Sequence, residues 1–349
     1  MSDLAAWKVR GPARTLRTEV AEWDLNEQTW RPPRSFSLAM FLPDGKIGTI
    51  EQHNFDGSVS RRTHLYNDAG RLAESQFRMD DGPISKVLHS YDEAGRELRT
   101  VDVAPDGTRR ESEICSYDSS GRKTTVRFLS LEQQQPNMCY GIEGTEQAYM
   151  APGAATMTIA HDERHRPAEV LFHDASGDLV RRLVFTRDRE GSVLSEEVYF
   201  GGTFPFADME KAFDIATPED RTRVSAMIAA AFSDQMFSST TYAYDQQGRL
   251  LERIRTMGML GRHRTTFRYD DDDSLIEEAT DENSRSVNVD DSGHVHVIEE
   301  RVPVHHLRFE YRYDALGNWT ERVVWSRIES NAEFQRSNVE RRSITYYET

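Results

Sequence analysis

A short turn sequence recurs along this chain and limits what the chain can fold into. It reads Tyr-Asp, two variable residues and Gly, usually followed by Arg. The glycines of the first four turns stand at positions 45, 70, 95 and 121, and Asp-Gly pairs with glycines at 57, 82 and 107 lie between them. Two interleaved turn series of this period leave eight or nine residues between turns, the length of a β-strand. Since Asp-Gly between β-rich runs is a strong hairpin signal, the spacing predicts an antiparallel meander.

The side chains of the longer turn have predictable structural roles. Its Asp is expected to accept backbone hydrogen bonds as an Asx turn, and its Gly to supply the left-handed position. In residues 306–313 the apolar and aromatic residues alternate with polar ones, which places the motif tyrosine on an aromatic face beside its counterparts. The residues assigned to this structural turn are Tyr66, Gly70, Tyr91, Asp92, Gly95, Tyr117, Asp118, Gly121, Tyr244, Asp245, Gly248, Tyr313, Asp314 and Gly317.

Two segments interrupt the period. Residues 131–158 contain Gln- and Pro-rich stretches typical of irregular structure. Residues 203–236 carry a helix start at Thr217-Pro218-Glu219, followed by Val224, Met227 and Ile228 at helical spacing. The pattern predicts a helical insertion at 203–236 within a single β-sheet domain that spans residues 1–349.

Composition favours a thin, surface-rich architecture. Only 37% of residues are hydrophobic and the mean hydropathy is −0.69, yet aromatic residues make up 10%. Repeats that share a core with their neighbours suit such values. The two cysteines, Cys115 and Cys139, are too few for a disulfide framework.

Charge and hydropathy also bear on partners and location. The formal net charge of −16 repels phosphate backbones, so nucleic acid is not an expected partner. No apolar run is long enough for a membrane span or a secretory signal, so we expect a cytoplasmic protein without a membrane partner. Basic residues are mostly arginine, which suits planar cross-strand pairing with carboxylates or reflects a GC-rich genome. We expect a bacterial source.

The recurring turn resembles the YD-repeat family, also called rearrangement-hotspot repeats. The segment from Tyr311 to Trp319 is especially similar to the family pattern, and weaker copies extend the resemblance over most of residues 36–325. The resemblance implies a wound ribbon of antiparallel hairpins, which in toxin-complex shells and teneurins spirals into a hollow cocoon. Toxin shells end in an Asp-Pro-x-Gly-Leu self-cleavage motif. Here the last copy reads Asp314-Ala315-Leu316-Gly317, so self-cleavage and a toxin payload do not carry over.

Size predicts how the ribbon is arranged. About seven hairpins give roughly fourteen strands, and twisted sheets beyond about ten strands curl or split. We therefore expect a mainly β fold: an antiparallel meander of YD-repeat hairpins forming a large curved open sheet or partial barrel, with a short α-helical insertion. Its exposed edges would need the insertion, the N-terminal strand or a second subunit as cover, which makes a homo-oligomer through sheet edges possible.

Three clusters of side chains could carry chemistry. His294 and His296 share a strand face and, with His305 or His306, could bind a transition metal; the alternative is a solvent-facing pair. The run Asp270–Asp273 could hold Ca²⁺ or form a solvated turn. The spacing does not support a nucleophile at Cys139, and no cofactor is expected.

Aromatic and arginine-rich faces can bind sugars or peptides, and the motif tyrosines can serve either as packing between repeats or as ligand contacts. The five tryptophans lie toward the chain ends, where they could act as caps: Trp7, Trp23, Trp30, Trp319 and Trp325.

The sequence leaves three hypotheses for function. The first is a non-enzymatic YD-repeat scaffold that binds a protein or a carbohydrate. The second is an orphan relative of toxin shells that acts as a chaperone or immunity-like partner. The third is a metal-dependent enzyme built on His294 and His296. Because the repeat uses its Tyr, Asp and Gly for structure, function should be sought where the period fails, at 131–158, 205–236 and 294–306.

Overall fold

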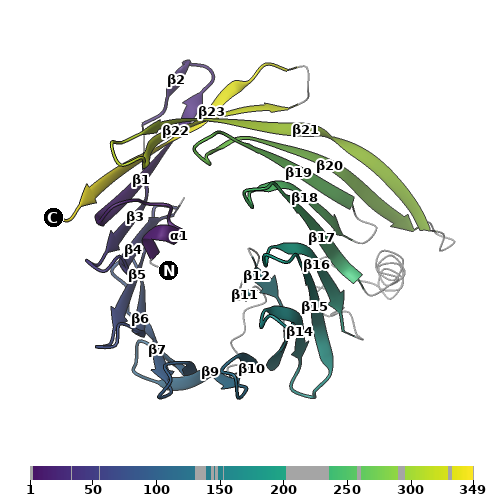
Figure 1. Ribbon diagram of the computed structural model, residues 1–349. Helices are drawn as coiled ribbons and strands as arrows, with labels where there is room; N and C mark the ends of the chain where they lie inside the picture. Colours follow the sequence, from purple (N-terminus) through teal and green to yellow (C-terminus); the bar gives the residue numbers. More distant parts are fainter. Residues whose placement is uncertain are drawn as a thin grey trace. The chain divides into compact units, whose positions relative to one another are not determined.

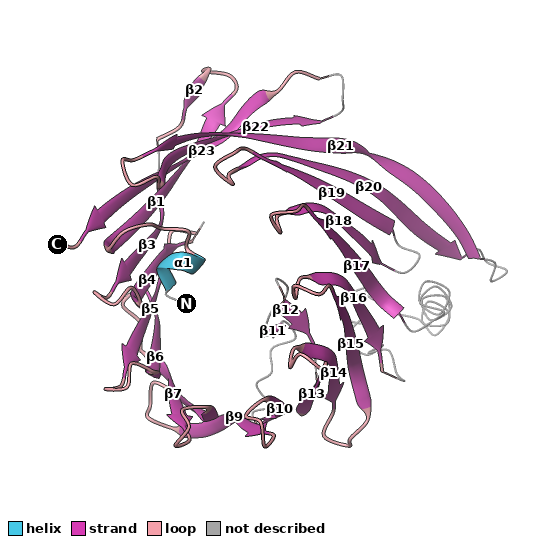
Figure 2. Cartoon of the chain, in the orientation of Figure 1, coloured by secondary structure: helices cyan, strands magenta, loops and turns pink. Residues whose placement is uncertain are grey.

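The fold consists almost entirely of antiparallel β-strands. The computed structural model describes residues 3–32, 34–54, 56–129, 139–142, 145, 148–151, 153–201, 236–257, 261–289, 295–328 and 332–348. Within these residues the only helix is the single turn α1 (Asp3–Ala6), and strands joined by short loops make up the rest (Figures 1 and 2). Apart from Met236, which begins a strand, the predicted helical insertion at 203–236 lies outside the described residues.

Contacts group the chain into two compact units, where the sequence predicted one domain. Unit 1 comprises residues 1–112, 270–277 and 306–349, and unit 2 comprises residues 113–269 and 278–305. Three strands contribute residues to both units: β9 (Arg109–Tyr117), β20 (Leu275–Val289) and β21 (Val295–Tyr313).

Unit 1 contains the first meander. Its strands are β1 (Ala13–Asp24), β2 (Thr29–Trp30), β3 (Arg34–Phe41), β4 (Ile47–His53), β5 (Val59–Tyr66), β6 (Leu72–Met79), β7 (Ser85–Tyr91), β8 (Glu97–Val103), β22 (Trp319–Ile328) and β23 (Gln335–Tyr346). From β3 to β8 each strand pairs antiparallel with the next, as the turn spacing predicts. Strands β5 and β7 contain no fully buried residue, so the low hydrophobic content reflects strands that are half-buried on both faces.

The first and last strands of the chain pair with each other in unit 1. Strand β1 pairs with β3 on one side and with β23 on the other, where Ala21 lies opposite Val339 and Leu16 opposite Ile344. Leu16 and Val339 are 0% and 1% exposed, so this pairing buries apolar side chains. The expectation of an open sheet is therefore wrong, because the first strand β1 has the last strand β23 and β3 as partners on its two sides.

Unit 2 contains the second meander. Its strands are β10 (Lys123–Phe128), β11 (Cys139–Gly141), β12 (Ala148–Met150), β13 (Thr156–His161), β14 (Pro167–His173), β15 (Leu179–Arg187), β16 (Val193–Phe200), β17 (Met236–Tyr244), β18 (Leu250–Met257) and β19 (Gly261–Tyr269). From β13 to β19 consecutive strands again pair antiparallel, and β13 also pairs with β10.

The irregular segment 131–158 supplies a small hairpin to the core of unit 2. Strands β11 and β12 pair only with each other in the described part of the chain. Ile142, just after β11, and Tyr149, in β12, belong to the same buried cluster as Phe172 and Phe185, and the rings of Tyr149 and Phe185 meet edge to face at 6.0 Å. The break in the period therefore adds a packing element to the sheet.

None of the helices in the described residues is long and apolar enough to span a membrane.

Candidate functional site

Most of the long turns are closed by their own aspartate, and Asn67 takes the same position in the turn at 66–71. In the copy at Asp118, one carboxylate oxygen accepts the backbone N–H of Ser120 at 2.9 Å and of Arg122 at 3.0 Å, and the other accepts the Arg122 Nε–H at 2.6 Å. Hydrogen bonds from the Ser120 hydroxyl and the Arg122 backbone hold the pKa of this carboxyl well below its ordinary value. The same Asp–Arg arrangement occurs at Asp92–Arg96, Asp162–Arg166 and Asp245–Arg249.

The motif tyrosines connect one turn to the preceding one. The Tyr66 hydroxyl donates to the Ile47 carbonyl and the Tyr91 hydroxyl to the Leu72 carbonyl, each at 2.8 Å. Tyr244 makes the equivalent bond to the Val193 carbonyl at 3.0 Å. These contacts give the tyrosine a structural role in joining successive repeats.

In two of the turns the basic residue after the glycine also reaches the next turn. The Arg71 guanidinium lies 5.8 Å from the centroid of the Tyr91 ring, and Lys46 stands in the same way 5.3 Å from that of Tyr66. Arg71 also occupies the space that a Cβ on Gly95 would need. The turn glycines at 70, 95, 121, 248 and 317 all have positive φ.

The acidic run Asp270–Asp273 forms another turn of this kind. Asp273 takes the glycine position with a φ of 63°, and the Asp270 carboxylate accepts the backbone N–H of Asp272 at 3.0 Å and of Ser274 at 2.8 Å. In the described residues, no three His, Cys, Asp or Glu side chains are grouped so that they could hold a metal ion. His294 and the side chains of His296 and Cys139 lie outside the described residues.

In the last turn Asn318 stands at the position that arginine holds in the turns at Asp92, Asp118 and Asp245. The Asn318 side chain is 2% exposed, accepts the Arg10 N–H at 2.6 Å and donates to the Arg10 carbonyl at 3.0 Å. The Tyr346 hydroxyl donates to Asp314 at 2.6 Å and lies 2.8 Å from the Asn318 amide. Burial and the hydrogen bond to Asp314 raise the pKa of Tyr346 to about 12. This turn joins the N-terminal segment to the last strand.

Tyr313 is the motif tyrosine that departs from the pattern. It is 42% exposed, and its hydroxyl lies 2.6 Å from that of Ser274. Tyr311, two residues earlier, donates instead to the Leu275 carbonyl at 2.9 Å. In this repeat Tyr311 provides the connection to the preceding turn.

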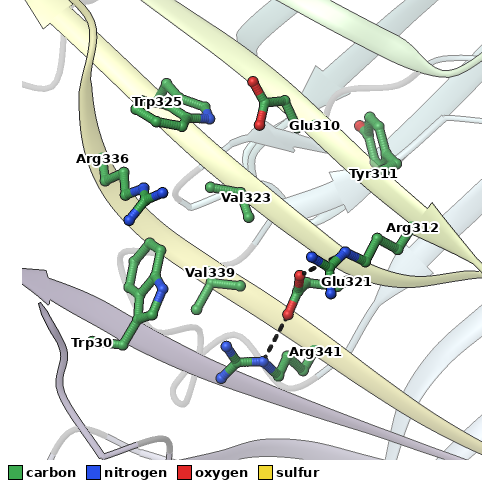
Figure 3. Close-up of a pocket in the computed structure, with 10 residues that line it drawn as sticks. All are labelled: Trp30, Glu310, Tyr311, Arg312, Glu321, Val323, Trp325, Arg336, Val339 and Arg341. Atoms are coloured by element: carbon green, nitrogen blue, oxygen red, sulfur yellow. Dashed lines mark hydrogen bonds and ion pairs between the residues drawn. The ribbon is translucent and has the colours of Figure 1, made fainter.

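A pocket of about 430 Å³ lies in unit 1 on strands β2, β21, β22 and β23 (Figure 3). Its lining combines aromatic rings, two valines and charged side chains. The lining residues are Trp30, Glu310, Tyr311, Arg312, Glu321, Val323, Trp325, Arg336, Val339 and Arg341.

The middle of the pocket is apolar and one side is charged. Val323 and Val339 lie opposite each other in the β22–β23 pair. Next to them Glu321 accepts a hydrogen bond from Arg341 Nε at 3.0 Å and forms an ion pair with Arg312 at 3.4 Å, as Figure 3 shows. Glu321 therefore fixes two arginines at the rim of an apolar surface.

Tryptophan rings and one arginine form the other side. The Arg336 guanidinium lies 4.8 Å from the ring centroid of Trp23 and 5.1 Å from that of Trp325. Trp30 meets Trp23 edge to face at 4.8 Å. Among the residues that the structure describes, Arg336 has no carboxylate partner, and its side chain is exposed. The side chain is thus held by aromatic rings while its N–H donors remain accessible.

The pocket does not lie in the segments where the sequence predicted function, which are those that interrupt the period. The sequence placed the tryptophans toward the chain ends, where they were expected to act as caps. Trp23 and Trp30 are about three hundred positions from Trp325 and Arg336, and only the β1–β23 pairing brings them together. The sequence pattern that could have indicated the pocket is the excess of tryptophan and arginine near both ends of the chain.

Comparisons with known proteins give only distant likenesses. No protein-family model and no curated protein matches the chain. A porin-like protein from Bacteroides uniformis ATCC 8492 is 10% identical, with 95% of this chain and 96% of that chain covered and a TM-score of 0.34. The structure of TcdB2-TccC3-Cdc42 is 12% identical, with coverage of 97% and 23% and a TM-score of 0.20. TcdB2-TccC3 without its hypervariable C-terminal region is also 12% identical, with coverage of 93% and 20% and a TM-score of 0.20. These TM-scores are too low to establish a shared fold.

Proposed function

We propose that this protein is a non-enzymatic β-scaffold of the YD-repeat type that binds a saccharide in the pocket on β2 and β21–β23. The observation that carries the proposal is the lining of that pocket, where Trp30 and two valines stand beside fixed arginines and glutamates. A protein partner, which the sequence equally allows, is an outcome that the experiment below separates.

The contacts of the repeat support the assignment as a scaffold. In four of the turns the Asp and the Arg bind each other, and Tyr66 and Tyr91 bind the preceding turn. These side chains are occupied in holding neighbouring hairpins together. The pocket residues, by contrast, include exposed donors and acceptors at Glu310, Arg312 and Arg336.

The chemistry of the lining suits a sugar. A sugar ring presents C–H groups on its faces and hydroxyls around its edge. Val323 and Trp30 offer apolar contacts for the faces, while Glu310 and Arg312 offer an acceptor and donors for hydroxyls. The volume of about 430 Å³ lies in the range of small-ligand sites.

Substitution of Trp30 by alanine tests the proposal. In titration calorimetry against saccharides selected from an oligosaccharide array, we expect Trp30→Ala to weaken binding at least about tenfold, because an aromatic contact contributes on the order of 1 kcal/mol or more. Thr29→Ala is the matched control, since Thr29 is exposed, adjacent in β2 and outside the pocket.

Two results would contradict the proposal. One is an array of neutral and acidic oligosaccharides on which the protein binds nothing. The other is a saccharide whose affinity is unchanged by Trp30→Ala. Binding of a purified partner protein that saccharides do not displace would assign the pocket to the protein class instead.

A further inference from the structure

We infer that the saccharide carries a carboxylate, as uronic and related sugar acids do, and that Arg336 is the residue that binds it. The inference rests on the proposed saccharide site and narrows its ligand to one chemical class. It follows from which charges in the pocket are already neutralised and which are not.

The charges that line the pocket do not balance. Three arginines, Arg312, Arg336 and Arg341, stand against the two carboxylates Glu310 and Glu321. Glu321 is shared by Arg312 at 3.4 Å and Arg341 at 3.0 Å. Glu310 is paired with an arginine outside the lining, Arg308, at 2.6 Å. Both carboxylates are therefore engaged without Arg336.

Arg336 remains as a cation without an anion. Within the described chain, its recorded contacts are with the rings of Trp23 and Trp325. Rings at 4.8 and 5.1 Å hold the guanidinium in place by cation–π attraction and leave its N–H groups to bind in their own plane. Less side-chain freedom is then lost when a ligand binds.

A planar, fixed guanidinium selects for a planar anion. Two parallel N–H donors match the two oxygens of a carboxylate in a bidentate pair, which adds geometric specificity to the charge. The net charge of −16 opposes anions at long range, so an acidic ligand depends on a local site of this kind. Sulfate and phosphate esters share the charge but not the planar geometry, and the experiment includes one of them.

The test compares three forms of one sugar. Titration calorimetry uses a uronic-acid trisaccharide, the same trisaccharide with its carboxylates reduced to alcohols, and a sulfated neutral trisaccharide. We expect the native protein to bind the acid at least about tenfold more tightly than the reduced form, and more tightly than the sulfated form.

Variants then assign the preference to one residue. Arg336→Gln is expected to abolish the preference for the acid over the reduced sugar. Arg336→Lys keeps the charge but lacks the planar guanidinium with its two parallel donors, so it should retain only part of the preference for the acid. Arg17→Gln, in β1 and outside the pocket, is the control for loss of an exposed arginine and should change neither affinity.

The outcomes separate the two proposals. Equal affinity of the native protein for acid and reduced sugars overturns the carboxylate inference and leaves the saccharide site standing. If the native protein binds none of the three forms and no sugar on the array, the proposed function is overturned. Tighter binding of the sulfated form, or an Arg336→Gln variant that keeps the preference, overturns the assignment to a carboxylate held by Arg336. The comparison on the native protein does not depend on whether any variant folds.

Discussion

Gly95 shows how closely one turn fits the next. Its φ is 84°, and a Cβ at this position would collide with the Arg71 guanidinium that reaches over from the preceding repeat. Gly107 has the same backbone conformation, with a φ of 85°, but no atom lies within 4 Å of the place of its Cβ. The two glycines therefore separate the cost of backbone strain from the cost of lost contact between repeats.

We expect Gly95→Ala to destabilise the protein more than Gly107→Ala. Both pay backbone strain of about 1–2 kcal/mol, and Gly95→Ala also displaces Arg71 from Tyr91, at an added cost of about 1 kcal/mol. Urea denaturation of the two variants and the parent protein measures the difference. Equal losses would show that the Arg71 contact contributes nothing to stability.

The strand pair β1–β23 is held at one end by a single side chain. Asn318 bonds both backbone groups of Arg10 and lies within hydrogen-bond distance of Tyr346, so it ties the segment before β1 to the end of β23. With its side chain buried, removal of the amide leaves polar groups without partners.

Asn318→Ala should lower the free energy of unfolding by about 2–3 kcal/mol, because more than one hydrogen-bonded group loses its partner. Hydrogen exchange should also accelerate in β1 and β23 but not in β4 and β5. Thr320→Ala, which loses one exposed side-chain bond of 3.3 Å, is the control. Unchanged exchange in β1 would contradict the role given to Asn318.

Much at the level of elements could be predicted from the sequence. The turns at Asp92, Asp118 and Asp245 follow from local rules, because an Asp and a Gly at fixed spacing close a turn without help from elsewhere. The sequence could not predict that Tyr311, and not Tyr313, makes the hydrogen bond to the backbone carbonyl of the preceding turn, because both tyrosines face the same side of the strand. Neither could the pocket, because the pairing of β1 with β23 leaves no local pattern in the sequence.

At the scale of the whole molecule, the turn aspartates act together on stability in acid. The pKa values of Asp92, Asp118, Asp162 and Asp245 all lie below the ordinary value. A carboxyl with a lower pKa in the folded state than in the unfolded state binds fewer protons when folded. Its stabilisation is complete above the unfolded pKa of about 3.9 and is lost as pH falls through the folded value.

Unfolding followed by circular dichroism between about pH 5 and pH 1.5 checks this dependence. We expect the denaturation midpoint to fall steeply below about pH 4. The difference in stability between the parent protein and Asp118→Asn should narrow as the pH is lowered. Asp81→Asn, at a fully exposed turn side chain, is the control and should track the parent at every pH. If the difference in stability between the parent protein and Asp118→Asn stayed constant with pH, the contribution of Asp118 to acid stability would be refuted.

The pairing of the first strand with the last has a consequence for biosynthesis. The hairpins from β3 to β8 join neighbours in sequence, so each can form soon after it leaves the ribosome. Strand β1 is made before any of them, yet one of its two edges stays unpaired until residues 335–346 have been translated. Throughout that interval the nascent chain exposes an unpaired strand edge that can pair with other chains. Binding of a chaperone to this edge, or degradation of the unfinished chain, would then govern the yield of native protein.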